Sequence, residues 1–236
     1  MLPLKDDIPS QSVPVVTLTL IALNVVIFLY QASLQVGGDA GAARAADQFA
    51  LEFGAVPCRL TGRCVTDDFP PPLLTIFTSM FLHGGLFHIG GNMLYLWIFG
   101  DNVEATLGHV RFLGFYLVSG VAAAVAQTGV APSSEVPMIG ASGAISGVLG
   151  AYLLLFPYAT VLTLITFGFF IRFVHVPAVI VLGFWIVVQF LSGLLSYGGL
   201  AGHGEGGGVA WFAHIGGFVA GLALVFLLRP HRPVRL

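Results

Sequence analysis

The sequence GASGAISGVLGA, residues 140–151, places Ser142 at the start of an apolar segment in which small residues recur at every fourth position. Residues four apart lie on one face of a helix, and small residues on such a face let two membrane helices approach closely. A later segment repeats this spacing with Gly217 and Gly221, and it carries His214 near its start. The two segments therefore predict a tightly packed helix pair that brings a serine and a histidine together.

The composition of the 236-residue chain is typical of a polytopic membrane protein. Charged residues make up 8% of the sequence and hydrophobic residues 57%, and the mean hydropathy is +0.94. These values exclude an ordinary soluble domain of this length. The net charge of −2 provides no basic surface for nucleic acid. We therefore expect the lipid bilayer as a partner and no nucleic-acid partner.

The hydropathy of the chain predicts six transmembrane helices, because a spanning helix needs about 20 mostly apolar residues. The expected spans are residues 13–34, 86–103, 109–129, 141–157, 177–198 and 209–228. We expect an all-α polytopic membrane protein, a six-helix bundle, in which one membrane-embedded domain covers residues 13–228. A short N-terminal tail, 1–12, and a basic C-terminal tail, 229–236, flank this domain.

The connecting segments differ in composition. Residues 37–72 are polar and predict an external loop. Gly84 and Gly85 break a long apolar stretch, and they separate an interfacial segment at 73–83 from the second span. The stretch 158–175 is short and is interrupted by an arginine and a histidine. It favours an interfacial or partly re-entrant connection over a seventh span.

Basic residues after the last span determine the expected orientation. Arg229, Arg232 and Arg235 follow this span closely, and positively charged flanks remain in the cytoplasm. An even number of spans then places the N-terminus in the cytoplasm as well. The second, fourth and sixth spans consequently start at the outer face of the membrane.

Four polar residues, His88, Asn92, Ser142 and His214, lie near these outer starts. Polar groups at membrane depth are costly and commonly functional, and a serine with a histidine is the minimum equipment for nucleophilic acyl transfer. Ser142 is the candidate nucleophile and His214 the candidate general base. Because every Asp and Glu lies in a loop, a tail or at a helix end, we expect a Ser–His dyad without an orienting acid.

His88 and Asn92 share one helix face, since they lie four residues apart. They could donate hydrogen bonds to the oxyanion of a tetrahedral intermediate, together with the free backbone N–H groups where Ser142 opens its helix. The alternatives are an interhelical hydrogen bond for Asn92 and a satisfied buried histidine for His88.

Two external loops allow more than one interpretation. Cys58 and Cys64 either form a disulfide, in an oxidising compartment, or remain two free thiols. Their spacing, without nearby histidines, is poor for zinc. The glycine-rich stretch 198–208 is either a mobile lid over the site or an ordinary flexible loop.

Four ordered motifs together resemble those of the rhomboid family of intramembrane serine proteases. The motifs are HGGLFHIGGN at 83–92, Gly100-x3-Glu104-x3-Gly108, GASG at 140–143 and His214-x2-Gly217-x3-Gly221. The resemblance implies Ser142 as nucleophile and His214 as base, with no cofactor and no metal. It also implies that His88, Asn92 and the Ser142 backbone stabilise the oxyanion.

The resemblance extends to structure and substrates. It implies that His83 orders the entrance of the site, and that the substrates are transmembrane helices of other proteins, cut near the outer face at small residues. A bacterial plasma membrane is the expected location. The residues expected to be structural are Gly100, Glu104, Gly108, Gly143, Gly147, Gly217 and Gly221.

One position departs from the family pattern. Many bacterial members carry an aromatic residue four places after the nucleophile, where it can stack on the catalytic imidazole. This chain has Ser146 there. The sequence therefore does not identify the group that holds the His214 ring.

Three other classes of protein are alternatives. A non-catalytic rhomboid-like protein that binds transmembrane helices would characteristically lack Ser142 or His214, and this chain keeps both. A metal or haem protein would use His83, His88 and His214, but the first two are splayed on a helix and no carboxylate or thiolate lies at that depth. A transporter would leave the serine motif unexplained, and no membrane-embedded acidic relay is present to support it.

Overall fold

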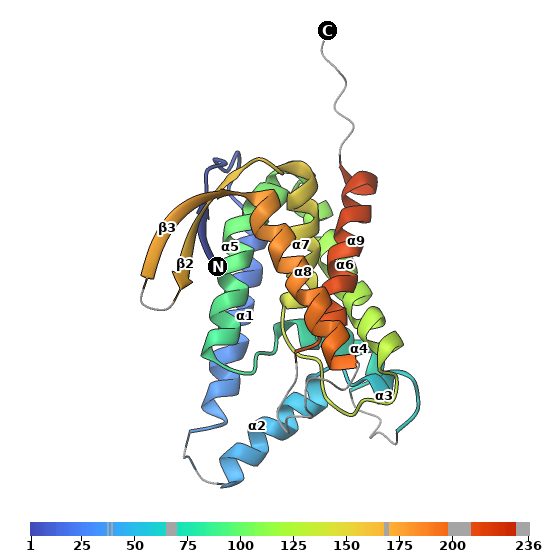
Figure 1. Ribbon diagram of the computed structural model, residues 1–236. Helices are drawn as coiled ribbons and strands as arrows, with labels where there is room; N and C mark the ends of the chain where they lie inside the picture. Colours follow the sequence, from blue (N-terminus) through green and yellow to red (C-terminus); the bar gives the residue numbers. More distant parts are fainter. Residues whose placement is uncertain (37, 39, 65–69, 168–169, 198–208, 230–236) are drawn as a thin grey trace.

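The computed structural model describes residues 1–229 apart from 37, 39, 65–69, 168–169 and 198–208. The chain folds into a helical bundle with a small antiparallel sheet beside it (Figure 1). Within the described ranges, four helices are long and apolar enough to cross a membrane, namely α1 (Val15–Ser33), α6 (His109–Val130), α8 (Ala178–Tyr197) and α9 (Trp211–Leu228). The protein is therefore a mostly helical, polytopic membrane protein, as the sequence predicts.

Two further helices complete the bundle. Helix α5 (Leu86–Leu107) is bent by 83° from the short α4 (Pro72–Thr78) and the 3-10 turn η1 (Ser79–Phe81), and this pair forms one more candidate span. The bend lies between η1 and α5, at the two glycines that the sequence predicts as a break. Helix α7 (Ser142–Leu155) is apolar but has only 14 residues. The count of six spans thus stays a prediction.

The expected external loop at 37–72 contains helical structure instead. Helix α2 (Ala40–Phe53) forms because its sequence, AGAARAADQFALEF, is rich in alanine, the strongest helix former. Its Phe49 ring packs edge-on against Tyr30 of α1, with ring centroids 5.5 Å apart. A second, shorter helix, α3 (Pro57–Leu60), follows. The polar connection between the first two spans is therefore partly helical rather than irregular.

The expected connection at 158–175 is a β-hairpin rather than a re-entrant segment. Strand β2 (Thr160–Phe167) pairs antiparallel with β3 (Phe170–Pro177), and β1 (Leu2–Asp6) pairs with the other edge of β2. The sequence of β2, TVLTLITF, is rich in β-branched residues, which favour strands. The N-terminal segment is accordingly held in a sheet and does not form a free tail.

Two aspartates fasten the N-terminal segment to the bundle. The Asp6 carboxylate accepts hydrogen bonds from the Tyr152 hydroxyl at 2.5 Å and from the Asn102 amide at 2.9 Å. Asp7 accepts a bond from the backbone N–H of Thr160 at 2.7 Å. Burial raises the pKa of Asp6, and the hydrogen bond from Tyr152 opposes this rise.

The Gly-x3-Glu-x3-Gly motif joins α5 to the start of α1. The fully buried Glu104 carboxylate accepts bonds from the backbone N–H groups of Val16 and Thr17, at 2.9 and 2.7 Å, and from the Thr17 hydroxyl at 2.7 Å. These N–H groups have no partner within their own helix, and a helix N-terminus favours a negative charge. Gly108 separates α5 from α6 with a φ of 81°, a conformation that favours glycine.

Helices α7 and α9 make direct backbone contact along a seam of glycines. A Cβ added to Gly217 would fall on the carbonyl of Gly143, and one added to Gly221 would fall on the backbone of Gly147. Gly147 is also tight against the Ser119 side chain of α6. The close helix pair that the four-residue spacing predicts is therefore confirmed.

We predict that Gly221→Ala destabilises the protein by about 1–3 kcal/mol, because a methyl group at this position would overpack the seam. The matched control is Gly183→Ala on α8, where an added Cβ meets no atom within 4 Å. Thermal unfolding of both variants in detergent measures the difference. Equal melting temperatures for the two variants would contradict a close-packed seam.

Candidate active site

The glycine seam brings Ser142 and His214 into hydrogen-bond contact. Ser142 is the first residue of α7, and His214 lies in the first turn of α9. The Ser142 Oγ and the His214 Nε2 are 2.8 Å apart. This distance lies within the range that proton transfer between a nucleophile and its base requires.

The start of α9 is held from α6. The side-chain carbonyl of Gln127 accepts hydrogen bonds from the backbone N–H groups of Phe212 and Ala213, at 3.1 and 3.3 Å. These two residues directly precede His214, so the contact fixes the backbone from which the imidazole projects. The stretch 198–208, a candidate lid, lies outside the described residues.

Besides Ser142, one polar and two aromatic side chains surround the His214 ring. The amide oxygen of Gln189 lies 2.7 Å from Nδ1. Trp185 and Trp211 lie with ring centroids 5.8 and 6.4 Å from the imidazole, at interplanar angles of 37° and 89°. The two tryptophans thus lie beside the imidazole. Ser146 does not contact the ring through a hydrogen bond but donates one to the Ser142 carbonyl, at 2.6 Å.

Sequence reasoning missed Gln189 and Trp185. Both lie on α8, four residues apart and hence on one face. The sequence feature that could have identified Gln189 is its position in the middle of a strongly apolar span, where a polar group is costly. Its 6% exposed surface shows that it faces the protein interior.

His88 and Asn92 lie beside the loop that leads to Ser142. A Cβ on Gly140 would be 2.7 Å from the His88 Nε2 and 3.5 Å from the Asn92 Nδ2, so both side chains point at this loop. The Asn92 amide nitrogen is buried without a hydrogen-bond partner. The structure thus gathers all four polar residues that the sequence selects. The His83 ring lies beside that of His88, with ring centroids 5.0 Å apart.

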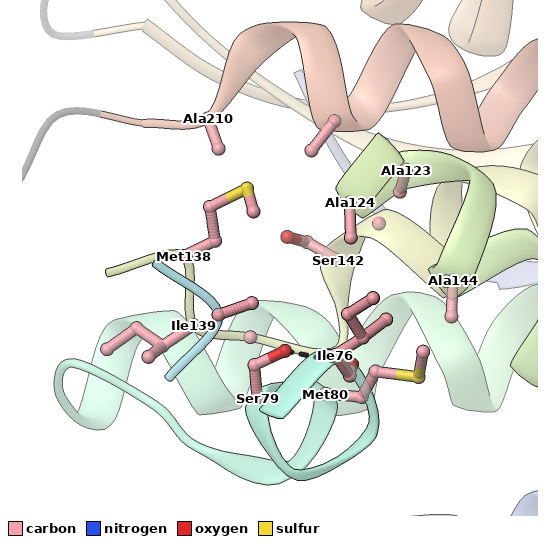
Figure 2. A pocket seen from close by; sticks show the side chains of 15 residues that line it. Ile76, Ser79, Met80, Ala123, Ala124, Met138, Ile139, Ser142, Ala144 and Ala210 are labelled. Carbon is pink, nitrogen blue, oxygen red and sulfur yellow. Dashed lines mark hydrogen bonds between the residues drawn. The ribbon is translucent and has the colours of Figure 1, made fainter. Parts of the chain in front are cut away.

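A small cavity of about 40 Å³ opens beside the serine. Figure 2 shows the Ser142 hydroxyl directed into this space, opposite Met138 and Ile139. The remaining lining is mostly alanine and glycine, with Met80 among the larger side chains. Since a cavity needs roughly 10–15 Å³ to hold one water, this space has room for a few water molecules or one small side chain.

A disulfide-closed loop supports the segment before Ser142. Cys58 and Cys64 are joined by a disulfide, which decides between the two states left open by the sequence. The Cys58 N–H donates to the Ser134 carbonyl at 3.0 Å. Ala55 and Met138 form a reciprocal backbone pair, with N–H to carbonyl distances of 3.1 and 2.8 Å. The wall of the cavity is therefore attached to this loop.

The histidines do not assemble a metal site in the part of the chain that the structure describes. No three His, Cys, Asp or Glu side chains come close enough there to hold an ion. The alternative that uses His83, His88 and His214 as metal ligands consequently has no ligand set among these residues.

The fold and the site define a class of protein, a polytopic membrane protein with a hydrogen-bonded Ser–His pair at the start of two packed helices. A sequence model of the Rhomboid domain matches residues 71–231, which is more than half of the chain. The chain belongs to the rhomboid family.

Individual relatives support this assignment. Rhomboid protein 1, mitochondrial, of Saccharomyces cerevisiae is 35% identical over 99 residues, 40% of this chain and 29% of that protein. RHOMBOID-like protein 1 of Arabidopsis thaliana is 33% identical over 162 residues, 66% of this chain and 35% of that protein. Rhomboid protease GluP of Bacillus subtilis is 36% identical over 127 residues, 54% of this chain and 24% of that protein. The matched regions thus span only about a quarter to a third of these relatives.

We predict that replacing both cysteines, Cys58→Ser with Cys64→Ser, lowers the free energy of unfolding by about 2 kcal/mol, because the bridge restricts the unfolded chain. Thermal unfolding in detergent, with and without reductant, measures the loss. The chain has no other cysteine, so the double variant should no longer respond to reductant. A wild-type melting temperature that reductant leaves unchanged would contradict the stabilising role.

Proposed function

We propose that this protein is an intramembrane serine endopeptidase that hydrolyses peptide bonds in or near transmembrane segments of other membrane proteins. The observation that carries the proposal is the 2.8 Å contact between the Ser142 Oγ and the His214 Nε2 within an apolar bundle. Membership of the rhomboid family, which includes proteins named as proteases, supports the same activity at the level of the family.

In the proposed reaction, the His214 Nε2 takes the hydroxyl proton while the Ser142 Oγ forms a bond to the substrate carbonyl carbon. The carbonyl electron pair moves to oxygen and gives a tetrahedral oxyanion. Its collapse breaks the C–N bond, and the proton on Nε2 passes to the leaving amine. Water, activated by the same nitrogen, then hydrolyses the acyl ester and restores the serine. None of these steps needs a metal or a cofactor.

The oxyanion requires hydrogen-bond donors placed before the reaction starts. We assign this role to the side chains of His88 and Asn92 and to the backbone N–H of Ser142. Two observations support the assignment: the Asn92 amide nitrogen is buried without a partner, and both side chains point at the loop before the nucleophile. The free N–H groups at the start of α7 add the favourable end of a helix dipole.

The cavity beside Ser142 indicates which substrate side chains the site accepts. Its size and its alanine and glycine lining suit a small side chain next to the cleaved bond. A peptide bond within a helix is protected by its own hydrogen bonds, so the substrate must unwind locally. Glycine, proline or small polar residues make this unwinding easier. We therefore propose transmembrane helices with small residues near one end as substrates.

We further propose that residues 13–228 form the single membrane domain of this protein, in a bacterial plasma membrane. The basic residue Arg229, followed by Arg232 and Arg235 in the sequence, supports a cytoplasmic C-terminus. A cytoplasmic N-terminus follows from six spans. The Ser–His pair would then lie toward the outer face, where water can reach it.

We predict that Ser142→Ala and His214→Ala each abolish covalent labelling by a fluorophosphonate probe and cleavage of a single-span substrate. The serine variant lacks the attacking oxygen, and the histidine variant lacks the base that activates it. Labelling of detergent-purified protein needs no knowledge of the natural substrate. Melting temperatures of the variants control for misfolding.

Two results would argue against this assignment. Labelling that survives in Ser142→Ala would mean that another residue is the nucleophile. A well-folded wild type that takes no label, yet captures a transmembrane helix without a cleavage product, would favour the non-catalytic binding protein.

We also predict that Asn92→Ala lowers kcat by about 10²-fold or more, the usual cost of removing one oxyanion donor. The matched control is Asn24→Ala on α1, since Asn24 is also buried but its amide donates to the Leu20 carbonyl of its own helix. Cleavage kinetics of both variants give the comparison. Equal kcat values for Asn92→Ala and the control would contradict the role of Asn92 as an oxyanion donor.

A further inference from the structure

Helix α8 contributes one buried polar side chain to the site, the amide of Gln189. Its Oε1 lies 2.7 Å from the His214 Nδ1, on the opposite side of the ring from Ser142. We propose that Gln189 is the positioning residue of the dyad, which fixes the tautomer and the orientation of the His214 imidazole. This inference rests on the proposed function, since it assigns a role within the same site.

The chemistry of the amide oxygen selects one tautomer of the histidine. A carbonyl oxygen can only accept a hydrogen bond, so its partner Nδ1 must carry the hydrogen. In a neutral imidazole the other nitrogen, Nε2, then has a free lone pair. This lone pair faces the Ser142 hydroxyl and can take its proton. The opposite tautomer would place a hydrogen on Nε2 and could not act as the base.

The same bond also restrains the ring as a whole. A hydrogen bond at each ring nitrogen defines the plane and direction of the imidazole. Trp185, one turn before Gln189 on α8, lies beside the ring. Many bacterial family members hold the catalytic imidazole with an aromatic residue at the position of Ser146. In this chain, Gln189 and Trp185 of α8 take over that contact with the ring. This arrangement gives the dyad a third member without an acidic group.

A neutral amide suits this location better than a carboxylate. Gln189 lies in a highly apolar span and is almost fully buried, where an ionised side chain would pay a large desolvation cost. The amide keeps the accepting oxygen and avoids that cost. It also gives less stabilisation to the imidazolium that forms during the reaction, so the pH response of the site is sensitive to the charge at this position.

Among the residues that the structure describes, His88 on α5 is the other titratable group near the His214 ring. The other side chains against the ring, from α7, α8 and α9, are Ser142, Gln189 and the two tryptophans, which carry no charge. A carboxylate introduced at position 189 would therefore be the only negative charge beside the imidazole in this part of the chain.

The test compares Gln189→Leu and Gln189→Glu with the wild type, by the pH dependence of fluorophosphonate labelling and of substrate cleavage. Leucine removes the acceptor, so kcat should fall by about 10-fold with little change in KM. Glutamate restores an acceptor and should recover part of this loss. Its charge favours the protonated ring, so the fall in activity on acidification should move to higher pH by roughly one unit or more.

A matched control separates positioning from stability. Gln31 on α1 is also a buried glutamine, and it exchanges hydrogen bonds with the His83 backbone rather than with the dyad. Gln31→Leu should lower the melting temperature without moving the pH profile. Wild-type kcat and an unshifted pH profile in both Gln189 variants would overturn the inference. Labelling that is kept in both Gln189 variants but lost in Ser142→Ala and in His214→Ala would at the same time leave the proposed function intact.

A measurement that does not depend on activity completes the test. Nitrogen NMR of labelled histidine in the Ser142→Ala background distinguishes a hydrogen on Nδ1 from one on Nε2. We expect the Nδ1–H tautomer when Gln189 is present and a mixture of tautomers in Gln189→Leu. The same mixture with Gln189 in place would refute its positioning role, whatever the outcome of the labelling experiments.

Discussion

The contact between the backbones of α7 and α9 is the constraint on which the site depends. In a lipid environment the packing of two helices gains little from the hydrophobic effect and relies on close van der Waals contact. Glycines at four-residue spacing permit that contact, and the seam formed by Gly143, Gly147, Gly217 and Gly221 extends directly from the first turns of both helices. Ser142 and His214 lie together at one end of this seam. Their 2.8 Å separation is thus a result of helix packing, with no flexible loop between them.

Two other polar side chains in the bundle satisfy backbone N–H groups of a neighbouring helix. Glu104 satisfies N–H groups at the start of α1, and Gln127 does so at the start of α9. Both side chains reach across from a neighbouring helix to a terminus that has unpaired donors. Helix starts are therefore fixed in three dimensions at two places, and one of these places directly precedes His214.

The sequence predicted the helices and the site well where local patterns carried the information. The four-residue glycine spacing predicted the α7–α9 contact, and the polar residues at helix starts predicted the gathering of His88, Asn92, Ser142 and His214. Hydropathy failed where pairing is non-local, since nothing near 160–177 in the chain reveals that β1 lies beside it. Gln189 was missed for a related reason. Its direction depends on how α8 rotates against α9, and a single polar residue in an apolar span does not determine that rotation.

The β1–β2 pairing has a consequence for the order in which the protein is made. Strand β1 is synthesised long before its partner β2, as the hydrogen bond between Asp7 and Thr160, 153 residues apart, illustrates. Helices α1, α5, α6 and α7 leave the ribosome before β2 exists. Strand β1 therefore lacks its pairing strand while these helices are being made. The pairing of β1 with β2 is consequently a late step, because β2 follows α7 in the chain.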